Sequence, residues 1–245
     1  MILYNTYEVE QKKINKVSTS PVKKTIFTLN IGNYSPEITD LTYPFIQKYA
    51  NSIDANFHII SKRKFPGYPI LYEKMQVFEL GEGNDWNIFV DSDCLISPNL
   101  FDITEVLPEN TVMTYGADFA GGRFKYDNFF RRDGRNIGAS TFFTVASSFC
   151  IDIWEPLNDI TLDEAIGNIK MTELEKSLGH KPGYGINDYL ISRNMAKYGI
   201  KYKTFPDLLQ DIGRPFGEFF FHDHLVGDKE KAKYIREKIK EWNST

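Results

Sequence analysis

The stretch NIFVDSD at residues 87–93 decides the fold of this chain. It begins with a strand-like, largely apolar run, which is the pattern of a strand covered on both faces. Asp91 and Asp93 follow at the carboxyl end of that run, and side chains two positions apart on a strand share a face. The stretch therefore predicts a buried strand with two converging carboxylates at its end.

The segment before this strand alternates between strand-like and helix-like patterns. Ser35 and Pro36 signal a helix start, and Pro44 predicts a break in that helix. The order β-α-β-α-β predicts a parallel sheet with right-handed crossovers, in which ligands bind beyond the carboxyl ends of the strands. The expected elements are strands over 24–29 and 57–61 and helices over 38–53 and 70–80.

The second half of the chain is less regular. Between two expected strands lies a glycine-rich, aromatic and basic stretch, residues 116–139, which is either a surface loop or a substrate-facing lid. Capping-box patterns at Thr161 and Thr172 predict two short helices. The remaining expected elements are strands over 111–115 and 140–146 and helices over 187–198 and 228–242.

Composition narrows the function classes. The chain has 245 residues, with 29 basic against 33 acidic, so its net charge of -4 argues against a general binder of nucleic acid or anionic membranes. Cys94 and Cys150 lack metal-ligand spacing and are expected to be free thiols. No apolar run is long enough to span a bilayer, so we expect a soluble, cytoplasmic protein. The aromatic share of 15% reflects core packing or a sugar-stacking surface.

Paired carboxylates at a strand end suit a hard divalent cation shared with diphosphate oxygens, although two solvated acids are the plain alternative. A second group of metal-binding residue types lies far along the chain, where His222 and His224 follow an aromatic run. They are expected to be metal ligands or packed histidines. Lys229 and Lys231, at the start of the last helix, are candidates for holding phosphate, or else lie on a solvated helix face.

These motifs resemble the nucleotide-sugar glycosyltransferases of the GT-A fold, in particular the glycogenin-like and galactosyltransferase-like branch. Lys74, seventeen residues before Asp91, is similar to that family's basic residue, and 87–93 to its Asp-x-Asp strand. Residues 224–227 resemble its His-x-x-Gly element, and 183–190 its acidic helix start beside the donor sugar. The resemblance covers about residues 23–232. His222 competes with His224, and residues 137–140 lack the family's usual asparagine.

The resemblance implies an α/β, GT-A (Rossmann-like) fold with a mixed, mostly parallel central sheet flanked by helices. Residues 1–22 would be an N-terminal extension and 23–245 a single domain. Within that domain, 23–110 would form the nucleotide-binding half and 111–245 the acceptor-side half.

The implied reaction transfers a hexosyl or pentosyl group from a nucleoside diphosphate sugar to an acceptor hydroxyl. The favoured donor is a UDP-sugar, and the favoured acceptor is a glycan. Retention is favoured over inversion. The implied partners are thus a nucleotide sugar and a glycan or other hydroxyl acceptor. The implied Mn²⁺ or Mg²⁺ ligands are Asp91, Asp93 and His224, with His222 as the alternative to His224.

The other residues have roles by the same resemblance. Asp188 would be the catalytic carboxylate near the reacting carbon. The donor would be contacted by Lys74, Ser92, Lys229 or Lys231, and by the loop that holds Asn30 and Tyr34. Asp118 and Arg123 are candidates for contact with the sugar or the acceptor.

Two rival functions remain. The run from Val90 to Leu95 also resembles the aspartyl nucleophile strand of haloacid dehalogenase-type phosphohydrolases. That type normally opens its domain with this strand, whereas here two strand-helix units come first. The other rival is a non-catalytic carbohydrate-binding protein.

Overall fold

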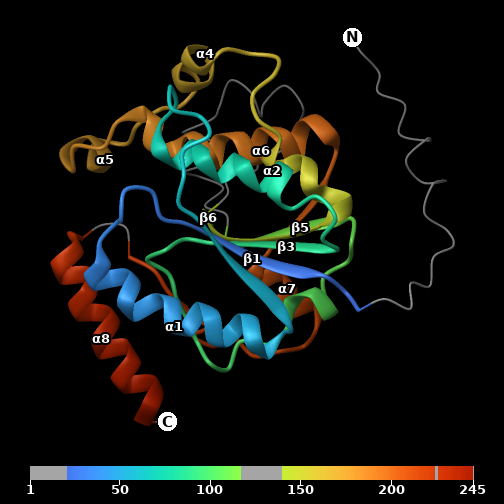
Figure 1. Cartoon of the computed structure of the whole chain (residues 1–245), viewed down its shortest axis with the longest axis vertical. Coiled ribbons are helices and arrows are strands. Elements are labelled where there is room, and N and C mark those ends of the chain that lie inside the picture. Colours follow the sequence, from blue (N-terminus) through green and yellow to red (C-terminus); the bar gives the residue numbers. More distant parts are fainter. Residues whose placement is uncertain (1–20, 117–139, 224–225, 245) are drawn as a thin grey trace, which may run out of the picture.

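The computed structural model describes residues 21–116, 140–223 and 226–244 (Figure 1). Within these ranges a six-stranded sheet has the order β2-β1-β3-β6-β5-β7. Strand β6 runs antiparallel to both of its neighbours, and all other pairings are parallel. The expected mixed, mostly parallel sheet is therefore confirmed. Its strands are β1 (Lys24–Leu29), β2 (Ala55–Ile60), β3 (Trp86–Val90), β5 (Thr111–Gly116), β6 (Ser140–Ser147) and β7 (Lys201–Thr204).

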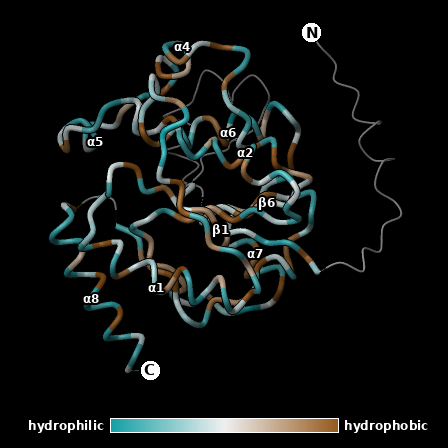
Figure 2. The backbone as a smooth tube through the Cα atoms, in the orientation of Figure 1, coloured by the Kyte–Doolittle hydropathy of each residue, from teal (hydrophilic) through white to brown (hydrophobic). Residues whose placement is uncertain are grey.

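Helices cover both faces of the sheet (Figure 1). One face carries α2 (Val77–Leu80), α4 (Leu162–Gly167), α6 (Ile186–Tyr198) and the 3-10 helix η4 (Ser148–Trp154); the other carries α1 (Pro36–Ser52), α7 (Phe205–Asp211) and α8 (Asp228–Ser244). Alternate residues of a strand supply the two cores, because successive side chains point to opposite faces. Phe89 packs on the first face and Ile88 on the second. The strands are accordingly hydrophobic and the outer helix α8 mostly hydrophilic (Figure 2).

Helix α1 runs unbroken through Pro44, so the predicted break is wrong. Pro44 has no backbone N–H to donate to the carbonyl of Asp40, one turn earlier, and both residues are exposed. Because water can satisfy that carbonyl, the helix tolerates the proline here. The predicted start is confirmed, since Pro36 is its first residue and Ser35 its N-cap.

The predicted helix over 70–80 is helical, but most of it is the 3-10 helix η2 (Ile70–Gln76), with a single α-helical turn after it. Two adjacent charged residues in η2 are buried, and each has a tertiary partner. Glu73 accepts hydrogen bonds from the backbone amides of Lys64 and Phe65, at 2.9 and 3.0 Å, and from Arg63 Nε at 3.0 Å. Lys74 turns toward the sheet instead. These partners fix the segment more firmly than helix propensity does.

A second, two-stranded sheet brings distant parts of the chain together. Strand β4 (Leu95–Ile96) pairs antiparallel with β8 (Phe220–Phe221), so that Leu95 lies opposite Phe221. Residue 222 thereby comes beside the Asp-x-Asp stretch. In the described part of the aromatic run before His222, Phe220 and Phe221 form this strand.

Most other helices of the second half form where the sequence patterns predict them. The capping boxes at Thr161 and Thr172 form, opening α4 and α5 (Glu173–Ser177). Helix α6 ends at Gly199, whose φ of 66° is left-handed, and α8 packs on α1 through Ile38 and Ile235. Short 3-10 helices complete the order, η3 (Ile103–Glu105) and η5 (Pro182–Gly185).

Cys94 and Cys150 are free and buried, as expected. Among the described helices, none is both long enough and apolar enough to cross a bilayer. Asp118, Arg123 and His224 lie outside the described residues, as do residues 1–20 of the expected extension.

Candidate active site

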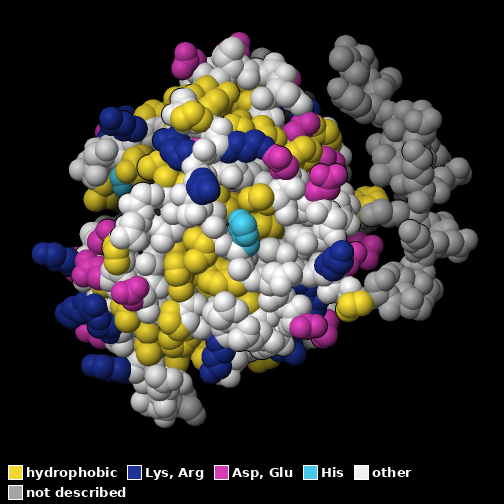
Figure 3. Space-filling view, viewed as in Figure 1, with side chains coloured by type: hydrophobic (Ala, Val, Ile, Leu, Met, Phe, Trp, Pro, Cys, Tyr) yellow, Lys and Arg dark blue, Asp and Glu magenta, His cyan; other side chains and the backbone are white. Residues whose placement is uncertain are grey.

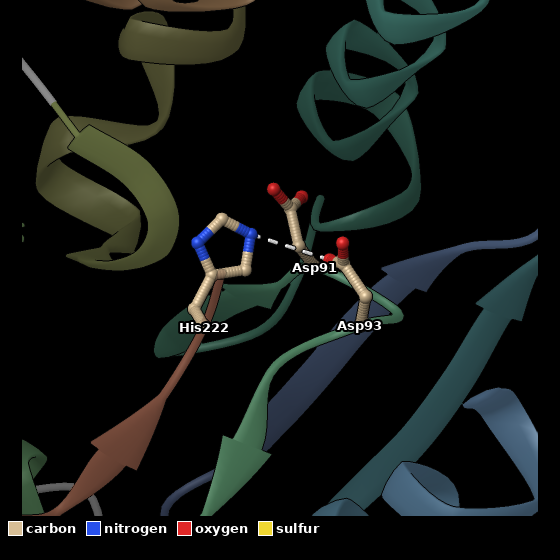
Figure 4. Close-up of side chains that lie close together, drawn as sticks. All are labelled: Asp91, Asp93 and His222. Atoms are coloured by element: carbon tan, nitrogen blue, oxygen red, sulfur yellow. Dashed lines mark ion pairs between the residues drawn. The ribbon is translucent and has the colours of Figure 1, made fainter. Parts of the chain in front are cut away.

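Three side chains converge where β3 ends (Figure 4). Asp91 is the first residue after β3, and a turn closed by a hydrogen bond from Cys94 N to Asp91 O (3.0 Å) places Asp93 next to it. His222 arrives from the end of β8. Each of the three offers a ligand atom, and these atoms all lie within 4.8 Å of one another. The pairing of β4 with β8 thus brings His222 beside two acids that precede it by 131 and 129 positions.

Asp93 is held between two partners. Its Oδ1 lies 3.3 Å from His222 Nε2 and its Oδ2 lies 2.5 Å from Lys231 Nζ. Burial alone would raise the pKa of Asp93, but the hydrogen bonds and charges of His222 and Lys231 outweigh it and hold that pKa well below its usual range. Asp93 is thus an ionised carboxylate.

The imidazole of His222 is fixed from behind by an aromatic ring. Phe142 stacks on it, with ring centroids 4.3 Å apart and an interplanar angle of 16°. Phe142 in turn contacts Tyr115 and Phe220 at centroid distances of 4.7 and 6.3 Å. Part of the high aromatic content is therefore core packing that orients a site residue.

Asp91 has its own lysine. Lys74 Nζ lies 2.5 Å from Asp91 Oδ1, and the lysine is only 1% exposed. Its ammonium also stands 4.8 Å from the ring centroid of Phe89, a cation-π contact from inside the core. The two acids are therefore not the solvated pair of the plain alternative, because each carboxylate is paired with a buried lysine.

Lys74 also links this cluster to the start of α6. The amide of Asn187 is oriented with its oxygen toward Lys74 Nζ, at 3.2 Å, because the opposite orientation would set two donors against each other. Its nitrogen donates to the carbonyl of Tyr184 at 3.3 Å. Asn187 is therefore a bridge between the acid cluster and the helix that carries Asp188.

Asp188 faces β6. Its Oδ1 accepts a hydrogen bond from Thr141 N at 3.2 Å and another from the Thr141 hydroxyl. Gly185 is the N-cap of α6, so the carboxylate does not serve as an ordinary cap. From the sequence alone, Asn187 and Asp188 also fit an ordinary helix cap pair, and this geometry argues against that alternative.

The loop after β1 lies on the other side of the acids. Tyr34 N donates to Asn30 Oδ1 at 2.8 Å, which closes the loop on itself. Burial, the acids Asp93 and Asp91, and a hydrogen bond to Asp228 raise the pKa of the Tyr34 hydroxyl well above its usual value. Tyr34 therefore borders both the acid cluster and the start of α8.

Ser92 and the two lysines of α8, all expected to contact the donor, have different surroundings. Ser92 is 5% exposed, and its hydroxyl donates to the carbonyl of Leu29 and lies 3.2 Å from Thr28 Oγ1, so it ties β3 to β1. Lys229 is exposed, whereas Lys231, two residues on, is buried against Asp93.

Sequence reasoning missed some residues of this arrangement. Thr141 and Phe142 lie in a strand whose pattern carries only a packing signal, and Asp228 reads as an acid in the first turn of a helix. Asn187 was visible only as a cap residue. All four become recognisable only through contacts that the fold creates.

The three candidate ligands fit a hard divalent cation. Two carboxylates and one imidazole are ligand types that Mn²⁺ and Mg²⁺ accept. Ligands on opposite sides of Mg²⁺ stand roughly 4.2 Å apart, so a set within 4.8 Å needs only small side-chain rotations. The remaining positions would be left for water or ligand oxygens.

No family model and no curated protein matches the chain. Among the solved structures that are similar to it, two cover most of its length. One is a glycosyltransferase involved in the glycosylation of the major capsid of PBCV-1, with a TM-score of 0.49 and 10% identity over 89% of this chain and 100% of that one. The other is the galactosyltransferase LgtC in complex with donor and acceptor sugar analogs, with a TM-score of 0.46 and 11% identity over 87% of this chain and 95% of that one.

Proposed function

We propose that this protein is a metal-dependent glycosyltransferase that moves a sugar from a nucleoside diphosphate sugar to an acceptor hydroxyl. The observation that carries the proposal is the convergence of Asp91, Asp93 and His222 at the carboxyl end of β3, with one buried lysine on each carboxylate. The motif resemblance of 87–93 and of Lys74 supports the same assignment.

The charges of the cluster suit a diphosphate leaving group. A divalent cation bound there would act as a Lewis acid toward the departing diphosphate. Lys74 and Lys231 add fixed positive charge in a buried setting, where electrostatic stabilisation is stronger than in water. Lys229, exposed at the start of α8, would meet the outer phosphate oxygens.

His222 takes the imidazole role in this proposal. The motif resemblance favours His224, with His222 as the alternative, and among the described residues His222 is the histidine beside the two acids. Retention is favoured over inversion by the His-x-x-Gly resemblance.

Asp188 is proposed as the carboxylate near the reacting carbon. Its sequence neighbour Asn187 contacts Lys74, which pairs with Asp91, so Asp188 is linked to the acids through these two residues. With retention, its charge would orient the sugar as positive charge develops; with inversion, it would be the general base on the acceptor hydroxyl.

The donor nucleoside is proposed to bind the loop of Asn30 and Tyr34, with uracil as the base. Tyr34 is 37% exposed beside the acids and so presents a ring face for stacking. Residues 23–110 would then be the nucleotide-binding half, and 111–245 the acceptor-side half, with Asp118 and Arg123 toward the acceptor.

A panel of nucleotide sugars tests the proposal. We expect one UDP-sugar to be hydrolysed slowly with Mn²⁺ and to raise the melting temperature. The double variant Asp91→Asn, Asp93→Asn should lose both effects, while the matched surface variant Asp54→Asn keeps them. An aspartyl-phosphate intermediate without UDP release would instead indicate the phosphohydrolase. Sugar binding that is unaffected by the double variant, without turnover, would indicate a carbohydrate-binding protein.

A further inference from the structure

An exposed pair of aromatic side chains lies just before α6. The Tyr184 side chain is 58% exposed, more than Tyr34, Tyr115 or Tyr198, at 37 to 39%. Its ring stacks on His180, with centroids 4.9 Å apart and an interplanar angle of 16°. A near-parallel pair of this kind covers one ring face of each partner and leaves a flat, amphipathic platform beside solvent.

The backbone beneath the platform is fixed. His180 N donates to Glu175 O at 2.9 Å, after Gly179 with a left-handed φ of 75°, so the turn that ends α5 sets the position of His180. Tyr184 N donates to Lys181 O at 2.9 Å. Gly183 packs so closely on the ring of Pro69 that a Cβ there would lie 3.0 Å from it, which locks the segment against the residue before η2.

The platform is coupled to the proposed reaction centre. The carbonyl of Tyr184 accepts the hydrogen bond from the Asn187 amide, whose oxygen faces Lys74. Asp188 follows four residues after Tyr184. Tyr34, by contrast, reaches Asp93 and Asp228 from the loop after β1. Tyr34 thus reaches the acid cluster from the loop after β1, whereas the backbone of Tyr184 is joined to it through Asn187 and Lys74.

Figure 1 shows α5 and the start of α8 on the same side of the molecule, toward which β1 runs, and in Figure 3 the outline is indented between the surfaces over these two helices. A ligand that enters from this side passes the segment between α5 and α6. A pyranose ring matches such a platform, because one face presents C–H groups and the rim presents hydroxyls. A rigid tyrosine offers this contact at low entropic cost.

We infer that Tyr184, stacked on His180, is a specificity platform for a sugar ring of the acceptor, so that the acceptor class is a saccharide. This inference rests on the proposed function and deepens it. Stacking would hold the acceptor ring while one of its hydroxyls reaches the reacting carbon beside Asp188. A simple alcohol, which lacks a ring face, gains nothing from Tyr184.

Kinetics with and without acceptor test this inference. Tyr184→Ala should raise KM for saccharide acceptors about tenfold, the size of one stacked ring, and leave Mn²⁺-dependent donor hydrolysis and KM for glycerol unchanged. Tyr184→Phe should retain the wild-type KM, since the ring suffices. Tyr198→Ala, at the opposite end of α6, is the matched control and should leave these kinetic constants unchanged.

The proposal would be overturned if Tyr184→Ala left KM for saccharide acceptors unchanged. It would also be overturned if the variant lost donor hydrolysis to the same extent as saccharide transfer. If the wild type hydrolyses no nucleotide sugar, the proposed function fails. Saturation-transfer NMR with a saccharide panel then measures saccharide binding at Tyr184 independently of that function. Saccharide signals that vanish in Tyr184→Ala would support the platform even then. Absence of saccharide signals with the wild type, or signals that persist in the variant, would overturn it.

Discussion

Lys231 Nζ lies 2.5 Å from Asp93 Oδ2, across 138 residues of sequence. The lysine is 5% exposed, so this carboxylate is a close partner for a charge that is largely removed from water. A bound cation would compete with Lys231 for the negative charge of Asp93, because both stabilise it by the same Coulombic attraction.

We predict that Lys231→Met binds Mn²⁺ more tightly than the wild type, by about tenfold, since a buried unpaired carboxylate gains more from a cation. Without metal the variant should melt at a lower temperature, and Mn²⁺ should raise that temperature by more than it does in the wild type. Calorimetry and thermal shift measure both effects. Lys229→Met, two residues away and exposed, is the control; equal Mn²⁺ affinities of Lys231→Met and wild type would contradict the prediction.

The two lysines of the η2 region give a second, matched prediction. Lys74 is 1% exposed and pairs with Asp91, whereas Lys64 pairs with Glu79 while both side chains are largely exposed. Breaking a buried ion pair typically costs about 3 kcal/mol, and an exposed pair about 0.5 kcal/mol. Urea denaturation should therefore show a large loss of unfolding free energy for Lys74→Met and almost none for Lys64→Met. Similar losses in both would mean that Lys74 is solvated in solution.

The sequence predicted the position of the two acids at the end of a strand, but not the long-range contacts that they make. Apolar continuity over 88–90 and the spacing of Asp91 and Asp93 are local signals, and the structure follows them. The ion pair of Asp93 with Lys231 depends on how β4 pairs with β8 and how α8 packs on α1, and no local pattern contains that information.

The structure also differs from the sequence-based expectations where tertiary contacts or solvent exposure decide the outcome. Pro44 was expected to end a helix, but its position on the solvent face of α1 removes the penalty. Helix α7 is different, because it opens with a capping box of Thr204 and Asp207, a local signal of the same kind as those at Thr161 and Thr172. Thr141 carried no signal at all, because a threonine in a strand is ordinary until the fold places a carboxylate beside its hydroxyl.

A pH-dependent prediction concerns Glu155, remote from the metal ligands. Burial alone would raise the pKa of Glu155, but hydrogen bonds from Lys197, at 2.8 Å, and from the Tyr198 hydroxyl hold that pKa below its usual value. A carboxyl whose pKa is lowered by folding stabilises the native state above its unfolded pKa of about 4.3, and this stability is lost as the pH falls through the folded pKa.

The unfolding free energy of the wild type should therefore exceed that of Glu155→Gln most at pH 6 to 7, roughly two units above the usual carboxyl pKa, and the gap should shrink as the solution is acidified. Urea titrations at several pH values measure it. Glu173→Gln, whose side chain is 91% exposed, is the control and should show no such trend. A gap that stays constant with pH would refute the assignment.

Variants of Thr141 can distinguish a role in positioning Asp188 from a role in core packing. Its backbone N–H and hydroxyl both donate to Asp188 Oδ1, and the residue is 2% exposed. Thr141→Val keeps the shape of the side chain and removes the hydroxyl donor, so Asp188 should lose its fixed orientation. We expect kcat for transfer to fall about thirtyfold with donor KM within about twofold, as for a lost hydrogen bond to a charged group.

Thr141→Ser reverses the comparison, because it keeps the hydroxyl and removes a buried methyl group. It should retain kcat within about threefold while losing roughly 1 kcal/mol of unfolding free energy to the small cavity. A purely structural role predicts that activity follows stability, so that Ser loses kcat along with stability. Steady-state kinetics and urea denaturation on the same two proteins decide between these outcomes: positioning requires that the more active variant be the one that retains the hydroxyl, whatever its stability.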